Sequence, residues 1–130
     1  MTVSTMLSLL SQGFVTSLLI FALTLLFSMP LGLAVMFGRR SRLMPLRGFI
    51  KAYISIMRGT PLMLQLMVVF YGPKLLLGVT VPGNWRFTAV IVAFVINYAA
   101  YFAEIYRGGL ESIPRGQYEA AQVLGYTKAQ

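Results

Sequence analysis

Cysteine and histidine are absent from the 130-residue sequence, and only three carboxylates occur in it. The absence of cysteine excludes disulfides and thiol catalysis, and the usual zinc sites lose their common ligands. Three acids dispersed along the chain are also too few for a convincing cage of oxygen ligands around a hard metal ion. We therefore expect no metal and no cofactor, and no nucleophile and base pair indicates an enzyme.

Charge of either sign is scarce. Charged residues make up 11% of the chain and hydrophobic residues 58%, whereas a soluble domain carries about 25% charged residues. No charged residue precedes Arg39, and the apolar run 14–38 is long enough for a helix to cross a bilayer. Residues 1–12 lack the basic segment of a signal peptide. The sequence thus predicts a membrane protein whose first helix is retained.

Three apolar stretches predict three membrane spans, at about 14–37, 61–79 and 87–106. Pro30 predicts a kink in the first span, and the pair Gly72-Pro73 predicts that the second helix bends or ends there. Thr60 is expected to cap this second helix, with Pro61 as its first residue. Between the first two spans, apolar side chains recur at helical spacing, at Phe49, Tyr53, Ile56 and Met57. This spacing predicts an interfacial helix.

The net charge of +8 reports orientation in the membrane. Six basic residues follow the first predicted span, from Arg39 to Arg58, and the tail has three, whereas the loop before the last span has only Lys74 and Arg86. Positive loops face the cytoplasm, so the N-terminus is expected outside and the tail inside. The basic residues form no patch interleaved with exposed aromatics, so we expect no nucleic-acid partner.

Polar residues share one face of the third predicted span. Asn97, Tyr101 and Glu104 follow one another at helical spacing within an apolar helix. They could line a substrate pathway, with Glu104 orienting the substrate or attracting a cationic group. Alternatively, Glu104 pairs with Arg107 near the cytoplasmic interface, and Asn97 bonds to a neighbouring helix. Both interpretations are open from the sequence.

Two further polar side chains lie near the second predicted span. Gln65 needs a hydrogen-bonding partner inside hydrocarbon, which favours helix packing over substrate contact. Arg58 is interpreted either as a contact to lipid phosphate or as part of a cytoplasmic gate, and Arg107 is open to the same two interpretations.

The tail, residues 112–130, predicts a short cytoplasmic helix. Ser112 is a candidate cap and Gly125 a candidate end. Ala120 and Ala121 allow another surface to approach closely, and Glu119 can pair with a basic group on it. Docking to a partner protein and an ordinary amphipathic helix on the membrane surface are both open from these residues.

Three segments of the sequence resemble those of a known family. Glu119-Ala120-Ala121, with Gly125 four positions later, resembles the start of the EAA loop of ABC importer permeases. Two other segments resemble the polar amino acid branch of that family: Glu104 to Gln117, and Tyr53 to Tyr71, which includes Arg58-Gly59-Thr60-Pro61-Leu62 and Gln65. The resemblance covers nearly the whole chain and has its three segments in the family's order.

The resemblance implies an all-α polytopic helical bundle of the type I ABC importer permease kind, of which residues 1–130 are part of the transmembrane domain. It implies alternating access in the bacterial inner membrane, with the segment from Gln117 to Gly125 as the ATPase-coupling lever. The implied partners are a cytoplasmic ABC ATPase, a second permease copy or paralogue, and an extracytoplasmic amino acid binding protein, beside membrane lipid. No phosphate-binding loop occurs, so ATP hydrolysis is expected of the ATPase partner.

Family members continue beyond the coupling glycine into an Ile-x-Leu-Pro segment and further membrane helices. The sequence stops at Gln130, which favours a fragment over a truncated gene product. A small membrane scaffold or assembly protein without transport activity is the competing interpretation.

Overall fold

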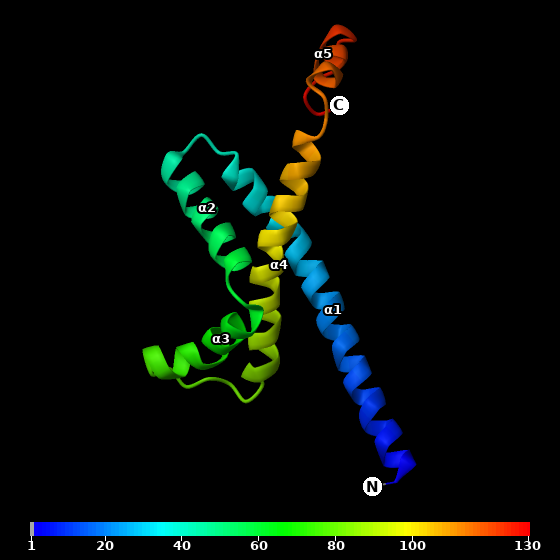
Figure 1. The fold of residues 1–130 in the computed structure, drawn as a ribbon, viewed down its shortest axis with the longest axis vertical. Coiled ribbons are helices and arrows are strands. Elements are labelled where there is room, and N and C mark those ends of the chain that lie inside the picture. Colours follow the sequence, from blue (N-terminus) through cyan, green and yellow to red (C-terminus); the bar gives the residue numbers. More distant parts are fainter. Residues whose placement is uncertain (1) are drawn as a thin grey trace.

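A computed structural model describes residues 2–130, which form helices joined by turns and loops, with no strand among them. The helices are α1 (Val3–Arg39), α2 (Met44–Gly59), α3 (Leu62–Leu77), α4 (Trp85–Glu111) and α5 (Arg115–Val123). Figure 1 shows α1 and α4 crossing, α2 beside the upper half of α4, and α3 turned away from α2 near the start of α4. Helix α5 extends past the end of α4. The all-α class expected from the sequence is therefore confirmed.

Helix α1 is longer than the predicted first span. It begins at Val3 rather than near Phe14 because Thr2 caps it, with the Thr2 hydroxyl accepting a bond from the Thr5 N–H at 3.2 Å. No helix breaker follows before Pro30, and the helix continues through Pro30 to Arg39. Helix α1 is long and apolar enough to cross a membrane, as is α4, which contains the predicted span 87–106.

The crossing of α1 and α4 is built from small side chains. On α1 the buried positions recur every four residues, at Thr24, Ser28, Gly32 and Met36. On α4, Ala99 and Ala103 lie against Gly32 of α1, while Ala100 packs toward α2 and Ala89 and Ala93 line clefts shared with α3. Within a bilayer, helices associate through close packing of such small residues, because lipid gives no hydrophobic drive between them. This crossing is the main helix contact of the structure.

The predicted second span corresponds to one short helix, α3, with a sharp bend before it. Helix α3 has 16 residues, which at 1.5 Å per residue is shorter than a hydrocarbon core of about 30 Å. It meets α2 at 111°, so the two form at most one broken span. The predicted capping is shifted by one residue: Pro61 is the N-cap of α3, and Thr60 ends α2.

A bend or an end was predicted at Gly72-Pro73, and the helix does not end there. Helix α3 runs through Pro73 and ends at Leu77, where Gly78 adopts a left-handed conformation with φ of 63°. Pro73 lies near the end of the helix, so it removes only one late backbone bond. The loop after α3 returns to Trp85, whose indole N–H donates to the Phe70 carbonyl at 3.0 Å and ties α4 to α3.

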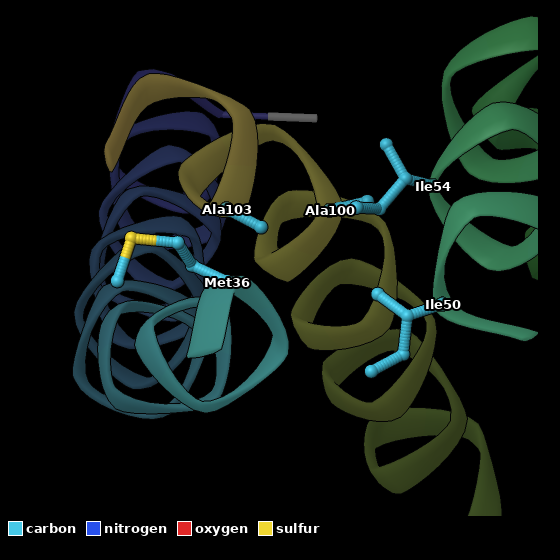
Figure 2. Close-up of a cluster of buried hydrophobic side chains, with 5 residues drawn as sticks. All are labelled: Met36, Ile50, Ile54, Ala100 and Ala103. Atoms are coloured by element: carbon cyan, nitrogen blue, oxygen red, sulfur yellow. The ribbon is translucent and has the colours of Figure 1, made fainter. Parts of the chain in front are cut away.

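A small core joins α2 to the crossing (Figure 2). Ile50 and Ile54 of α2 pack toward Ala100 and Ala103 of α4, and Met36 of α1 completes the cluster. Tyr53, which the sequence placed in an interfacial helix, is half-buried instead, and its hydroxyl donates to the Ile96 carbonyl. Helices α1 and α2 are thereby fixed against the C-terminal half of α4, which contains Tyr101, Glu104 and Arg107.

Candidate functional site

One carboxylate receives arginines from three helices. Glu104 lies on α4, and its partners are Arg39 at the end of α1, Arg58 near the end of α2, and Arg107 one turn further along α4. The apolar run of each helix ends close to its arginine, so each cation lies at the edge of a hydrophobic segment. We call these four residues the Glu104 cluster.

The geometry of the Glu104 cluster uses both carboxylate oxygens. Arg107 is bidentate: its Nη2 lies 2.7 Å from Oε2, and its Nε lies 3.3 Å from Oε1. Arg39 Nη1 donates to Oε1, and Arg58 Nη1 lies 3.4 Å from Oε2. Arg107 also binds Glu111, through Nη1 at 2.9 and 3.1 Å. Arg107 therefore links two acids, while Glu104 links three helices.

Burial of the side chains determines how much each of these ion pairs contributes to stability. The Glu104 side chain is 14% exposed, whereas that of Arg58 is 48% exposed. A shielded carboxylate needs its partners, because an unpaired charge away from water is costly, and exposed pairs contribute about 0 to 1 kcal/mol. We conclude that Arg39 and Arg107 are the strong partners of Glu104 and that Arg58 is held more loosely.

The polar face predicted on the third span is only partly assembled into this site. Tyr101 belongs to it, since the Arg58 guanidinium carbon lies 5.8 Å from the centre of the Tyr101 ring, within range of a cation–π contact. Asn97 lies two turns from Glu104 on α4 and is 5% exposed. It is absent from the walls of the cleft around Glu104.

A cleft of about 630 Å³ opens beside the Glu104 cluster, between α1, α2 and α4. Its charged lining consists of the cluster itself and Lys51, which gives four cations and one carboxylate. Such a lining has an excess of positive charge and attracts anionic groups. Arg39 and Lys51 were not singled out from the sequence. Their position on the predicted cytoplasmic side, like that of Glu104, was the available signal.

The two interpretations of Arg58 and Arg107 now separate on geometry. Both side chains contact a carboxylate of the same chain, which favours a gate contact over lipid phosphate. For Glu104, the predicted pair with Arg107 is present, and it is joined by two arginines from other helices. The pathway interpretation also keeps its geometric support, since Glu104 and Tyr101 both line the cleft.

Gln65 belongs to the bend between α2 and α3 and not to the cleft. Its amide nitrogen donates to the Thr60 hydroxyl at 2.7 Å and to the Met57 carbonyl at 3.1 Å. These bonds satisfy the donors of an amide that hydrocarbon would leave unpaired. The geometry favours the helix-packing interpretation of Gln65 over substrate contact.

The tail forms a helix with a well-defined end. Gln117, Glu119, Ala120 and Ala121 lie on α5, and the first three are exposed. Gly125 has φ of 81°, and the bonds from Tyr126 N–H to Ala121 O and from Gly125 N–H to Gln122 O form a Schellman motif. The predicted cap is wrong: Ser112 ends α4, and Pro114 precedes α5, because the Ser112 hydroxyl donates back to Gly109 O at 2.7 Å.

Metal-binding geometry is not found in the part of the chain that the structure covers. No group of three or more acidic residues occurs together within residues 2–130. Glu104, Glu111 and Glu119 instead take arginine partners. The site is thus an arrangement for charge recognition and for holding helices together.

Comparisons with known proteins identify related chains. Residues 28–130 match the family model described as "Binding-protein-dependent transport system inner membrane component". The L-cystine transport system permease protein TcyB of Bacillus subtilis is 37% identical over 119 residues, which is 91% of this chain and 49% of that protein. The arginine transport system permease protein ArtQ of the same organism is 38% identical over 114 residues, or 88% of this chain and 51% of ArtQ.

A solved structure has the same arrangement of helices. The "Crystal structure of an amino acid ABC transporter with histidines" matches with a TM-score of 0.75 and 34% sequence identity. The match covers 95% of this chain and 58% of that one. The chain spans about half the length of the curated relatives TcyB and ArtQ.

Proposed function

The chain belongs to the family of binding-protein-dependent transport system inner membrane components, and we propose that it supplies membrane helices of an ABC importer permease that carries a polar amino acid. The permease fold predicted from the sequence is confirmed by the likeness to the amino acid ABC transporter. TcyB and ArtQ are named for L-cystine and arginine transport. These two substrates are both amino acids, so their shared chemistry supports the substrate class and leaves the individual amino acid open.

The observation that carries the proposal is the continuity of α4. This helix begins at Trp85, contains Glu104 and ends at Glu111, and only three residues separate it from α5. A force applied to α5 would therefore act on the helix that holds the Glu104 cluster. Because Glu104 also binds Arg39 and Arg58, movement of α4 would strain its contacts to α1 and α2.

We assign the Glu104 cluster the role of a cytoplasmic gate. With its bonds formed, α1, α2 and α4 are held together on the predicted inner side of the membrane. With the looser Arg58 contact broken, the end of α2 that follows the Ile50–Ile54 core can move away from α4, and the cleft lined by Tyr101 widens. Alternating access requires two such states that bind substrate with different free energies. Asn97 and Gln65 then support the helices rather than contact the substrate.

We assign α5 the role of the coupling helix. Gln117, Glu119 and Ala120 lie exposed on it, and the Schellman motif at Gly125 fixes the direction of the chain after the helix. Small side chains allow a partner surface to approach, and Glu119 offers it a carboxylate. The partners in this proposal are a cytoplasmic ATPase, a second permease copy or paralogue, and an extracytoplasmic amino acid binding protein. The N-terminus then lies outside.

The decisive experiment measures ATPase assembly and uptake together in the full-length protein. Glu119→Lys is expected to abolish co-purification of the ATPase and amino acid uptake, because it reverses the charge that α5 presents. Gln130→Lys, an exposed change in the same tail, serves as the control and should leave both intact. If the unaltered full-length protein co-purifies with no ATPase at all, that result would support the competing scaffold function.

A further inference from the structure

A groove of about 1050 Å³ lies between the ends of α1 and α4 and the start of α5, on another side of α1 from Arg39. Its α1 wall contains Leu33, Phe37 and Arg40, and its other wall includes Ile105 of α4 and Arg115 of α5. The volume lies just above the range of roughly 300 to 1000 Å³ that is typical of small-ligand sites. The groove is therefore large enough for part of a lipid molecule.

The groove changes from apolar to basic along its length. Leu33 and Phe37 of α1 precede Arg40, which follows the end of that helix, and Ile105 precedes Arg115 in the same direction on the other wall. The ends of α1 and α4 and helix α5 lie toward the same end of the molecule (Figure 1). The apolar part thus lies at the level of the membrane spans, and the basic part lies at the edge that we predict to be cytoplasmic.

Two cations at this edge lack a strong partner. No ion pair in the described residues 2–130 involves Arg40. Arg115 reaches only Glu119, at 3.6 Å, and its side chain is 93% exposed. Arg107 and Glu111 also line the groove and bind each other, and Arg107 binds Glu104 as well. An anion placed between Arg40 and Arg115 would supply the missing negative charge.

We propose that this groove binds an anionic phospholipid of the leaflet at the α5 end of the protein. An acyl chain lies against Leu33, Phe37 and Ile105, and the headgroup phosphate lies between Arg40 and Arg115. Two basic residues near a lipid phosphate increase affinity by roughly 30-fold in total, since each contributes about fivefold. This inference does not rest on the proposed transport function.

Charge complementarity favours lipid over a second copy of this chain. The chain contains three acids, Glu104, Glu111 and Glu119. Glu104 and Glu111 are held by arginines within the same chain, which leaves the exposed Glu119, at 3.6 Å from Arg115, as the one carboxylate that a second copy could offer. A second copy therefore has little free negative charge to bring to Arg40. An anionic lipid brings both the charge and an apolar chain.

The first test removes the charge at the edge of the groove. The full-length protein is purified in detergent and titrated with dioleoylphosphatidylglycerol or dioleoylphosphatidylcholine, and native mass spectrometry measures the retained lipid. We expect tight retention of phosphatidylglycerol and a loss of roughly 30-fold in R40Q/R115Q. The variant R42Q/K128Q, with the same change of charge outside the groove, should bind like the wild type. Equal retention in both double variants would overturn the proposal.

The second test fills the groove without removing charge. Gly109 lines the groove, and a Cβ on Gly109 would meet nothing within 4 Å. Gly109→Phe should therefore fold and exclude the acyl chain. Gly108→Phe is the matched control, since Gly108 is equally open but does not line the groove. Equal lipid binding by the two variants would contradict the proposed acyl-chain site.

The source of the phosphate is decided by competition. Excess inorganic phosphate should not displace phosphatidylglycerol from the wild type, because free phosphate gains nothing from the apolar wall. Displacement by inorganic phosphate would overturn the lipid assignment, as would equal retention of phosphatidylcholine. A photo-crosslinker at Gly109 that captures a second copy of the chain instead of lipid would likewise overturn it. ATPase co-purification is measured separately, so its loss leaves the lipid result unaffected.

Discussion

Gly32 of α1 lies directly against Phe102 of α4. A Cβ on Gly32 would come within 2.7 Å of the Phe102 Cβ and 3.0 Å of the Ala99 carbonyl oxygen. The Phe102 Cβ is fixed to the α4 backbone and cannot swing away, so any side chain at position 32 pushes the two helices apart. The main helix crossing of the protein therefore depends on a hydrogen at this position.

Replacement of Gly32 by Ala is expected to destabilise the fold by about 1 to 3 kcal/mol, the range for overpacking a tight interior. Gly13→Ala, in the same helix, is the control because a Cβ there meets nothing within 4 Å. It should be neutral or stabilise by up to about 1 kcal/mol, since Ala has the higher helix propensity. Thermal unfolding in detergent measures both. Equal shifts would show that α1 and α4 do not cross at Gly32.

Replacement of Glu104 by Gln is expected to destabilise the protein by about 2 kcal/mol. Breaking a buried ion pair costs about 3 to 5 kcal/mol, and partial exposure of the cluster reduces this figure. Glu111→Gln is the matched control, because Glu111 is 64% exposed and binds only Arg107. Its cost should stay below about 1 kcal/mol. Unfolding curves that rank the two variants in the opposite order would contradict the central position of Glu104.

Replacement of Gln65 by Leu is expected to loosen the bend between α2 and α3. The substitution removes the bonds to the Thr60 hydroxyl and the Met57 carbonyl, each worth about 1 kcal/mol. Hydrogen exchange of residues 57–66 should become faster, by up to roughly 30-fold for the two bonds together. Gln117→Leu, on exposed α5, should leave this segment unchanged. Unaltered exchange in the Gln65 variant would contradict the helix-packing interpretation of Gln65 and favour substrate contact.

Replacement of Gly125 by Ala is expected to weaken the end of α5. A left-handed conformation costs a residue with a Cβ about 1 to 2 kcal/mol, and Gly125 has φ of 81°. Gly116→Ala lies within α5, where Ala should instead stabilise the helix by about 0.5 to 1 kcal/mol. Hydrogen exchange of residues 115–126 distinguishes the two changes. If both raised protection, the Schellman motif would not control the end of the helix.

Local signals in the sequence predicted much of the helical framework. The apolar runs placed 14–37 and 87–106 inside α1 and α4, and the glycine at 125 marked the end of α5. Apolar length, caps and glycines act within a few residues, so the sequence alone exposes them. The same reasoning allowed a helix end at Pro73 that does not occur, because a proline near the end of a helix loses little and does not break it.

The partners of the polar residues were harder to predict. The sequence related Glu104 to Arg107, three positions away, but Arg39 lies 65 positions from Glu104 and was not selected. Gln65 was expected to seek a neighbouring helix, yet the residues it reaches depend on the 111° bend between α2 and α3. Neither relation follows from spacing along one helix.

The sequence by itself determined that the chain is an all-α membrane protein, where its long apolar helices lie, and which family it resembles. Those properties depend on hydrophobic length, charge placement and motif order. Each of these acts within one segment of the chain, without contacts between segments. Only the tertiary structure decided that α1 crosses α4 at Gly32 and that Arg39, Arg58 and Arg107 share one carboxylate. The reason is that every apolar face suits lipid equally well, so close packing between particular small residues selects which faces meet.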